Sequence, residues 1–118
     1  MTDEERQDLR DFLAREVMDY PPGDTLSLGG ILLKQRYDYF RPDSADAPMS
    51  QLLGVIEKMR EKGFTLSLVS DVDGKAFHCA FILTPKNHWS VSKAYRSYAD
   101  TLPDAVCLAA RAATTGTP

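Results

Sequence analysis

The spacing of apolar residues changes along the chain and predicts an alternation of helices and strands. Residues 3–18 carry apolar side chains at three- and four-residue intervals, which predicts an amphipathic helix. Its apolar stripe is Leu9, Phe12, Leu13 and Val17. Thr2 and Glu5 have the spacing of a capping box, in which each side chain satisfies a free backbone N–H at the helix start. A Pro-Pro-Gly sequence at 21–23 ends this helix.

A second helix is predicted after Pro48, which suits a first helical turn. Ser44 or Asp46 is the expected N-cap, and Gly63 ends the helix. The apolar stripe is Met49, Leu52, Leu53, Ile56 and Met59.

The last helix is predicted to begin near Thr101, whose side chain suits an N-cap, with Pro103 and Asp104 in its first turn. Its small apolar face, suited to close packing, is Leu102, Val106, Ala109, Ala110 and Ala113. Residues 114–118 are predicted to be a frayed tail.

Strand periodicity occupies the region between the last two helices. Apolar and polar residues alternate from Phe64 to Leu68 and again from Phe77 to Leu83, on either side of an Asp-Val-Asp-Gly turn. This pattern predicts a β-hairpin, and residues 91–98 add a third strand. Residues 24–41 are predicted to form another hairpin or a pair of short strands, with a turn at the Gly-Gly pair 29–30.

The order of elements predicts an α+β fold in which helices pack on a small antiparallel sheet. The chain of 118 residues fits one domain, residues 1–118. Its acidic N-terminus lacks the features of a signal peptide, and Cys79 and Cys107 are interpreted as reduced core residues. We therefore expect a cytoplasmic protein. A net charge of −3 argues against broad nucleic-acid binding, although a few arginines can still hold a small anion.

The sequence predicts no enzyme, metal site or cofactor. A nucleophile needs a neighbouring base, and the only imidazoles are His78 and His88. His78 adjoins Cys79 in a predicted strand, where adjacent side chains point to opposite faces, so His78 is interpreted as a partly exposed sheet residue. Asp71 and Asp73 imitate the start of a calcium loop whose later ligands are missing. The glycines at 29–30 lack the Lys-Ser or Lys-Thr of a phosphate-binding loop.

Aromatic and basic residues cluster in two places outside the helical stripes. The first group is Lys34, Arg36, Tyr37, Tyr39, Phe40 and Arg41. The second is Lys86, Asn87, His88, Trp89, Lys93, Tyr95, Arg96 and Tyr98. Such groups suit base stacking with phosphate pairing, and they equally suit a protein–protein interface or an ordinary sheet surface.

Three segments resemble the phage ABA sandwich domain family. LRDFLAREVMDY (9–20) is similar to its opening helix with a Val-Met-Gly-aromatic signature. YFRPDSADAPMSQLLGVIEKMREKGF (39–64) is similar to its aromatic-x-Pro-Ser-x-Asp entry into a helix ending in Glu-Lys-Met. YADTLPDAVCLAARAA (98–113) is similar to its closing Ala-Asp-Thr-x-Pro-x-Ala-Ile-Cys-Arg-Ala helix. Asp19 stands where the family usually has Gly, and Leu108 where it often has Arg, with Arg111 about one turn later.

The resemblance implies a phage or prophage origin and an α-β-α sandwich. Some proteins of this fold are Thoeris anti-defence proteins, which sequester cyclic nucleotide signals and work as homo-oligomers with ligand at subunit contacts. The resemblance thus implies a non-enzymatic sponge for a cyclic nucleotide or a cyclic ADP-ribose type of ligand.

For such a sponge, the candidate ligand-binding residues are Phe81, Trp89, Lys93, Tyr95, Arg96 and Arg111. Stacking is assigned to Phe81, Trp89 or Tyr95, and phosphate contacts to Arg96 or Arg111. The alternative hypothesis is an inhibitor or adaptor that binds a host protein. A small enzyme is the third and least supported.

Overall fold

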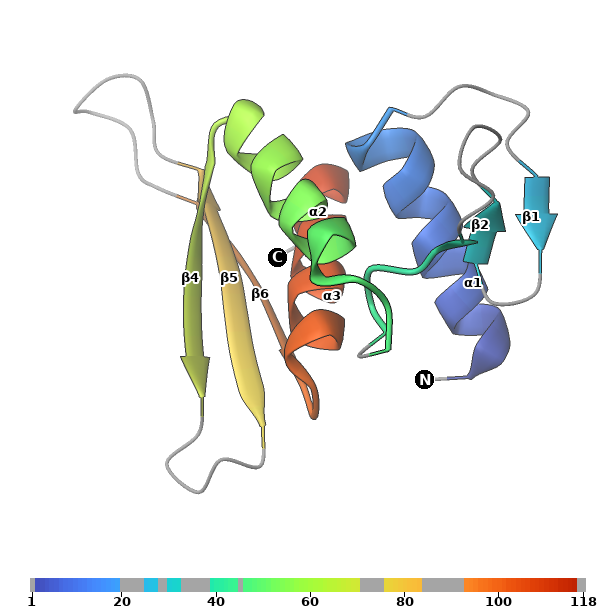
Figure 1. The fold of residues 1–118 in the computed structure, drawn as a ribbon. Coiled ribbons are helices and arrows are strands. Elements are labelled where there is room, and N and C mark those ends of the chain that lie inside the picture. The colour runs from blue at the N-terminus through green and yellow to red at the C-terminus, as the bar shows by residue number, and fades with distance from the viewer. Residues whose placement is uncertain are drawn as a thin grey trace.

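A three-stranded antiparallel sheet with helices on one of its faces organises the fold in the computed structural model (Figure 1). The structure describes residues 2–19, 25–27, 30–32, 39–44, 46–70, 76–83 and 93–116. The sheet has the order β4 (Phe64–Ser70), β5 (Phe77–Leu83) and β6 (Lys93–Ala99). Its two antiparallel registers pair Leu66 with Phe81 and Phe81 with Tyr95. The predicted hairpin and third strand are therefore confirmed.

The helices form two layers on the same side of this sheet. α2 (Met49–Glu61) packs on β4, and α3 (Leu102–Thr115) packs on β5 and β6. α1 (Asp3–Phe12) and the π-helical turn η1 (Leu13–Val17) pack against α2 and α3 from the far side. The α+β class, with an antiparallel sheet and packed helices, is confirmed. The described helices all lie on one face of the sheet, whereas the resemblance implies a helix layer on each face (Figure 1).

A second small antiparallel sheet lies beside α1. It has the order β1 (Thr25–Ser27), β2 (Gly30–Leu32) and β3 (Tyr39–Phe40), and β2 lies against α1. The predicted hairpin is confirmed, but Gly30 pairs with Ser27 as part of β2 and does not belong to the turn that was predicted at the Gly-Gly pair. β3 adds a third strand to it and ends at Phe40, whose side chain is buried in the core.

The first helix is capped as predicted but changes its winding after Phe12. Thr2 Oγ1 accepts a hydrogen bond from Glu5 N–H at 3.1 Å. The π-helical turn was not predicted, because its wider hydrogen bonding leaves no signature in the apolar spacing. Asp19 follows with φ of 55°, a left-handed conformation that glycine adopts most readily and that Asp tolerates better than most residues.

The ends of the other helices correct two details of the prediction. Neither Ser44 nor Asp46 caps α2: the N-cap is Pro48, which makes no side-chain cap, and Ser44 Oγ instead accepts from Asp46 N–H. Gly63 ends α2 with φ of 98°, as predicted. Thr101 caps α3 through Asp104 N–H, as predicted. α3 continues to Thr115, so the helix includes the start of the expected frayed tail.

A buried network of two arginines and two aspartates ties α1 to both later helices. Asp43, which precedes α2, has a fully buried side chain that accepts two hydrogen bonds from Arg10, at 2.7 and 3.0 Å. Arg6 donates to Asp43 at 2.9 Å and to both carboxylate oxygens of Asp104 at 2.7 and 3.1 Å. The hydrogen bonds to Asp104 are the main cause that raises the pKa of Arg6 above its ordinary value. Four charges thus balance inside the protein.

We expect Asp43→Asn to lower the free energy of unfolding by about 3 kcal/mol, because it removes the fully buried carboxylate and leaves two partly buried arginines facing one remaining carboxylate. Chemical denaturation followed by circular dichroism measures this. Asp46→Asn is the matched control, since Asp46 is exposed and forms no ion pair with a described residue. Equal stability of the two variants would contradict a structural role for the network.

Candidate functional site

The face of the β4–β6 sheet that the helices leave uncovered is the main candidate site. We call it the open face. Side chains alternate along each strand, and Cys79, Phe81 and Tyr95 point to the helices and are buried. The residues between them therefore form the open face: Thr65, Ser67, Val69, His78, Ala80, Ile82, Ala94, Arg96 and Tyr98.

Aromatic and apolar surface gathers at one end of the open face. The registers place Val69, His78 and Tyr98 in one row across the three strands. Val69 is 56% exposed and Tyr98 is 66% exposed. The rings of His78 and Tyr98 stack with centroids 4.5 Å apart and an interplanar angle of 9°. Because the two rings lie face to face, His78 covers one face of the Tyr98 ring, and the other face is where a planar ligand could stack.

Arginine lies in the next row of the same face. Arg96 is exposed and pairs with Ala80, two residues before Tyr98 on β6. None of the residues of β4, β5 and β6 is acidic, although the chain has 17 Asp and Glu. The strands contribute Arg96 to this face and Lys93 to the opposite face, and they contribute no carboxylate. The charge of the sheet therefore favours an anion.

His78 has an unusual side-chain nitrogen. Its Nε2 is buried and has no hydrogen-bond partner among the described residues. A buried polar atom normally has a partner, because desolvation without one costs free energy. The interpretation of His78 as a partly exposed sheet residue is confirmed, and its stacking on Tyr98 adds a role that the sequence did not predict.

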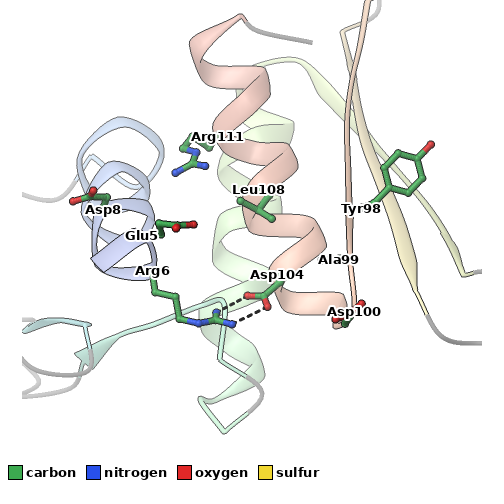
Figure 2. Close-up of a pocket in the computed structure, with 9 residues that line it drawn as sticks. All are labelled: Glu5, Arg6, Asp8, Tyr98, Ala99, Asp100, Asp104, Leu108 and Arg111. Atoms are coloured by element: carbon green, nitrogen blue, oxygen red, sulfur yellow. Dashed lines mark hydrogen bonds and ion pairs between the residues drawn. The ribbon is translucent and has the colours of Figure 1, made fainter. Parts of the chain in front are cut away.

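A pocket of about 550 Å³ lies between α1, α3 and the end of β6 (Figure 2). Leu108 and Arg111 both line it, so Arg111 presents a guanidinium to this pocket. The other charges of its lining are Glu5, Arg6, Asp8, Asp100 and Asp104. Carboxylates outnumber guanidiniums there, and Arg6 is already bound to Asp104. The pocket thus suits an anion less well than the open face does.

The structure separates the residues that the sequence analysis grouped as ligand-binding. Phe81 and Tyr95 lie in the core, where each makes an edge-to-face contact with Phe64 at 6.5 and 6.1 Å. Lys93 and Arg96 are exposed on opposite faces of β6. Arg111 lines the pocket instead, and Trp89 lies outside the described residues. Among the described residues of this group, only Arg96 belongs to the open face.

Tyr98 and His78 are the residues of the open face that the candidate set lacked. Tyr98 stood in the second aromatic and basic group, and strand parity was the signal that could have selected it. Tyr95 shares a face with buried Phe81, so Arg96 and Tyr98 must share the opposite one. The stacked ring of His78 follows from the register of β5 and β6, which the sequence did not specify.

Both thiols are unreactive in their environments. Burial raises the pKa of Cys79 to about 12, and burial is also the main cause that raises the pKa of Cys107. Both side chains are therefore protonated at neutral pH and are poor nucleophiles. His88 lies outside the described residues. Within the described ranges, no three His, Cys, Asp or Glu residues lie close enough together to hold a metal ion.

Comparison with known proteins gives no relative: no family model, no curated protein and no solved structure matches the chain. The resemblance to the phage ABA sandwich domain therefore stays a prediction. Among the described helices, none has the length and apolar character needed to cross a bilayer.

We expect neither Cys79 nor Cys107 to react with Ellman's reagent in the native protein at pH 8, because both thiols are buried and protonated. The absorbance of the released thiolate measures this. The protein unfolded in guanidinium is the control, and its 2 cysteines react at once. Rapid labelling of the native protein would contradict the buried positions.

Proposed function

We propose that this protein is a non-enzymatic phage or prophage accessory protein that sequesters a small nucleotide signal in the host cytosol and so counters antiviral defence. The observation that carries the binding part is the open face, where the His78–Tyr98 stack lies beside Arg96 in a sheet without carboxylates. The antiviral role and the cyclic ligand rest on the family resemblance alone, which is an argument by analogy.

The chemistry of the open face matches the two parts of a nucleotide. Tyr98 offers an exposed ring on which a base stacks, and its stacking on His78 holds that ring in place. Arg96 lies on the same strand and the same face, so its guanidinium reaches a phosphate attached to the stacked base. The missing carboxylates remove the repulsion that an acidic protein otherwise exerts on a phosphate.

Sequestration requires that the protein bind the ligand, and it requires no chemical reaction. The face must hold the ligand tightly enough, and the protein must be abundant enough, to lower the free concentration of the signal. No bond of the ligand breaks, which agrees with two thiols whose raised pKa keeps them protonated. A bound ligand is therefore expected to be released chemically unchanged when the protein is denatured.

A second candidate function is a protein inhibitor or adaptor that binds a host protein. The exposed side chains of Val69 and Tyr98 favour it, because protein interfaces are rich in aromatic side chains such as tyrosine. The two functions use the same residues and differ in the size of the partner. Binding of small molecules by the purified protein therefore separates them.

We expect native mass spectrometry to detect binding from a panel of cyclic nucleotides and cyclic ADP-ribose isomers, and calorimetry to measure the affinity of the ligand found. Tyr98→Ala removes the stacking ring, and Arg96→Ala removes the phosphate contact. Each is expected to weaken binding by about fivefold or more, since base stacking contributes about 1–3 kcal/mol.

Arg60→Ala is the control, because Arg60 is an exposed arginine of α2 and its removal changes the net charge as Arg96→Ala does. The control should bind like the unmodified protein. Binding that survives Tyr98→Ala and Arg96→Ala would show that the ligand lies elsewhere. Absence of binding across the panel would overturn the nucleotide proposal and favour the second candidate.

A further inference from the structure

The outer edge of β4 is an unpaired sheet edge. β4 hydrogen-bonds to β5 on one side, and no described strand pairs with its other side. Five of its residues, Thr65 and the run 67–70, are exposed. The backbone N–H and C=O groups along this edge therefore offer a template for another strand.

β4 lacks the features that usually protect such an edge. Its sequence, Phe64–Ser70, contains no lysine, no other charge and no proline. Its pairing with β5 runs through all seven positions without a bulge. The opposite edge of the sheet is different, because β6 carries Lys93 and Arg96. One edge is therefore protected by charge and the other is left available.

Exposed apolar side chains concentrate on β4 and on the helix that packs on it. The described residues include five large exposed hydrophobic side chains, and four of them belong to β4 or to α2, which packs on it: Met49, Leu53, Leu68 and Val69. α2 runs into β4 through a turn at Gly63, so the two lie antiparallel (Figure 1). A helix rises about 1.5 Å and a strand about 3.3 Å per residue, which places Leu53 level with Leu68, roughly 15 Å from the turn.

We propose that β4 pairs antiparallel with β4 of a second copy of this chain, about a two-fold axis at Ser67, to form one continuous six-stranded sheet. Ser67 is the middle residue of the strand, so this register pairs all of its positions. Leu66 then lies opposite Leu68 of the second copy, and Thr65 opposite Val69. The inference does not depend on the proposed function.

A second copy suits this edge better than an unrelated strand does, because the uncharged residues of β4 would pair with uncharged residues of its own copy. The axis stands perpendicular to the sheet, so both helical layers fall on one side and both open faces on the other. Leu68, 43% exposed in one chain, gains an apolar neighbour on the helical side. The two α2 helices, each packed on its own β4, lie on the helical side of the joined sheet. No charge of β4 meets its own copy at the axis, whereas β6 pairing with itself would bring cations together.

The test begins with the mass of the full chain in solution, measured by light scattering after size exclusion. We expect twice the 13.1 kDa of one chain. Ser67→Lys places two like charges at the axis and is expected to give the single-chain mass. Ala94→Lys is the matched control, because it adds the same charge to the same face on the other edge strand, and it should remain a dimer. Circular dichroism confirms that each variant is folded.

A mixture of two oppositely charged variants tests whether Ser67 faces its own copy. Ser67→Glu alone is also expected to be monomeric, but an equal mixture of Ser67→Lys and Ser67→Glu should recover the dimer mass, since opposite charges then meet at the axis. In a separate variant, Ser67→Cys should form a covalent dimer on oxidation. Directly opposed residues of antiparallel strands have Cα atoms about 4.5–5.5 Å apart, within disulfide range. Ala94→Cys should not cross-link, and the native thiols are buried.

A monomeric unmodified chain would overturn the proposal. So would a dimer that persists in Ser67→Lys, or one that Ala94→Lys disrupts, because either result assigns the contact to another surface. Failure of the mixed variants to recover the dimer would show that Ser67 does not face its own copy. Nucleotide binding by Tyr98 and Arg96 is measured separately, so the failure of one proposal is distinguishable from the failure of the other.

Discussion

The fold depends on a fully buried aspartate. Asp43 is bound by Arg10 and Arg6, and Arg6 is bound in turn by Asp104 at the start of α3. A carboxylate that is removed from water is stable only when cations and hydrogen bonds replace that water. α1, the segment that contains Asp43 and the start of α3 must therefore keep their relative positions. The network therefore attaches the first helix to the helical layer that covers the sheet. It also neutralises one wall of the pocket in which Arg111 lies.

Local spacing predicted the elements but not this network. The stripe of Leu9 and Leu13 faces the core, and the Thr101 cap forms as the sequence indicated. Arg6 and Arg10, by contrast, follow the pattern of a solvated helix face, and Asp104 fits its role as a first-turn residue without any partner. Their bonds join residues 33 to 98 positions apart. Only the packing of α1 on α3 brings them together, and no periodicity within one helix encodes that packing.

For the candidate site too, the sequence predicted the strand but not the packing of its side chains. The sequence placed aromatic and basic residues together on β6 but did not decide which of them the helices would bury. α3 presents Ala109, Ala110 and Ala113 to its neighbours, and such small residues allow close approach. Tyr95 and Phe81 fill that interface on the helical side. Strand parity then leaves Arg96 and Tyr98 on the open face, so the core determines which aromatic side chains remain available to a ligand.

Tyr98 and Arg96 lie on β6, at the edge of the sheet opposite to β4, so the proposed ligand site is separate from the proposed contact between copies. In a continuous six-stranded sheet the two β6 strands are the outermost ones, about 24 Å apart at a spacing of about 4.8 Å per strand. One nucleotide does not bridge that distance, so each Tyr98 and Arg96 pair acts on its own ligand. Pairing through β4 leaves both open faces uncovered, because the new contact lies in the plane of the sheet. The proposed assembly would therefore use the uncharged edge of β4 and leave Arg96 and Tyr98 of each copy accessible.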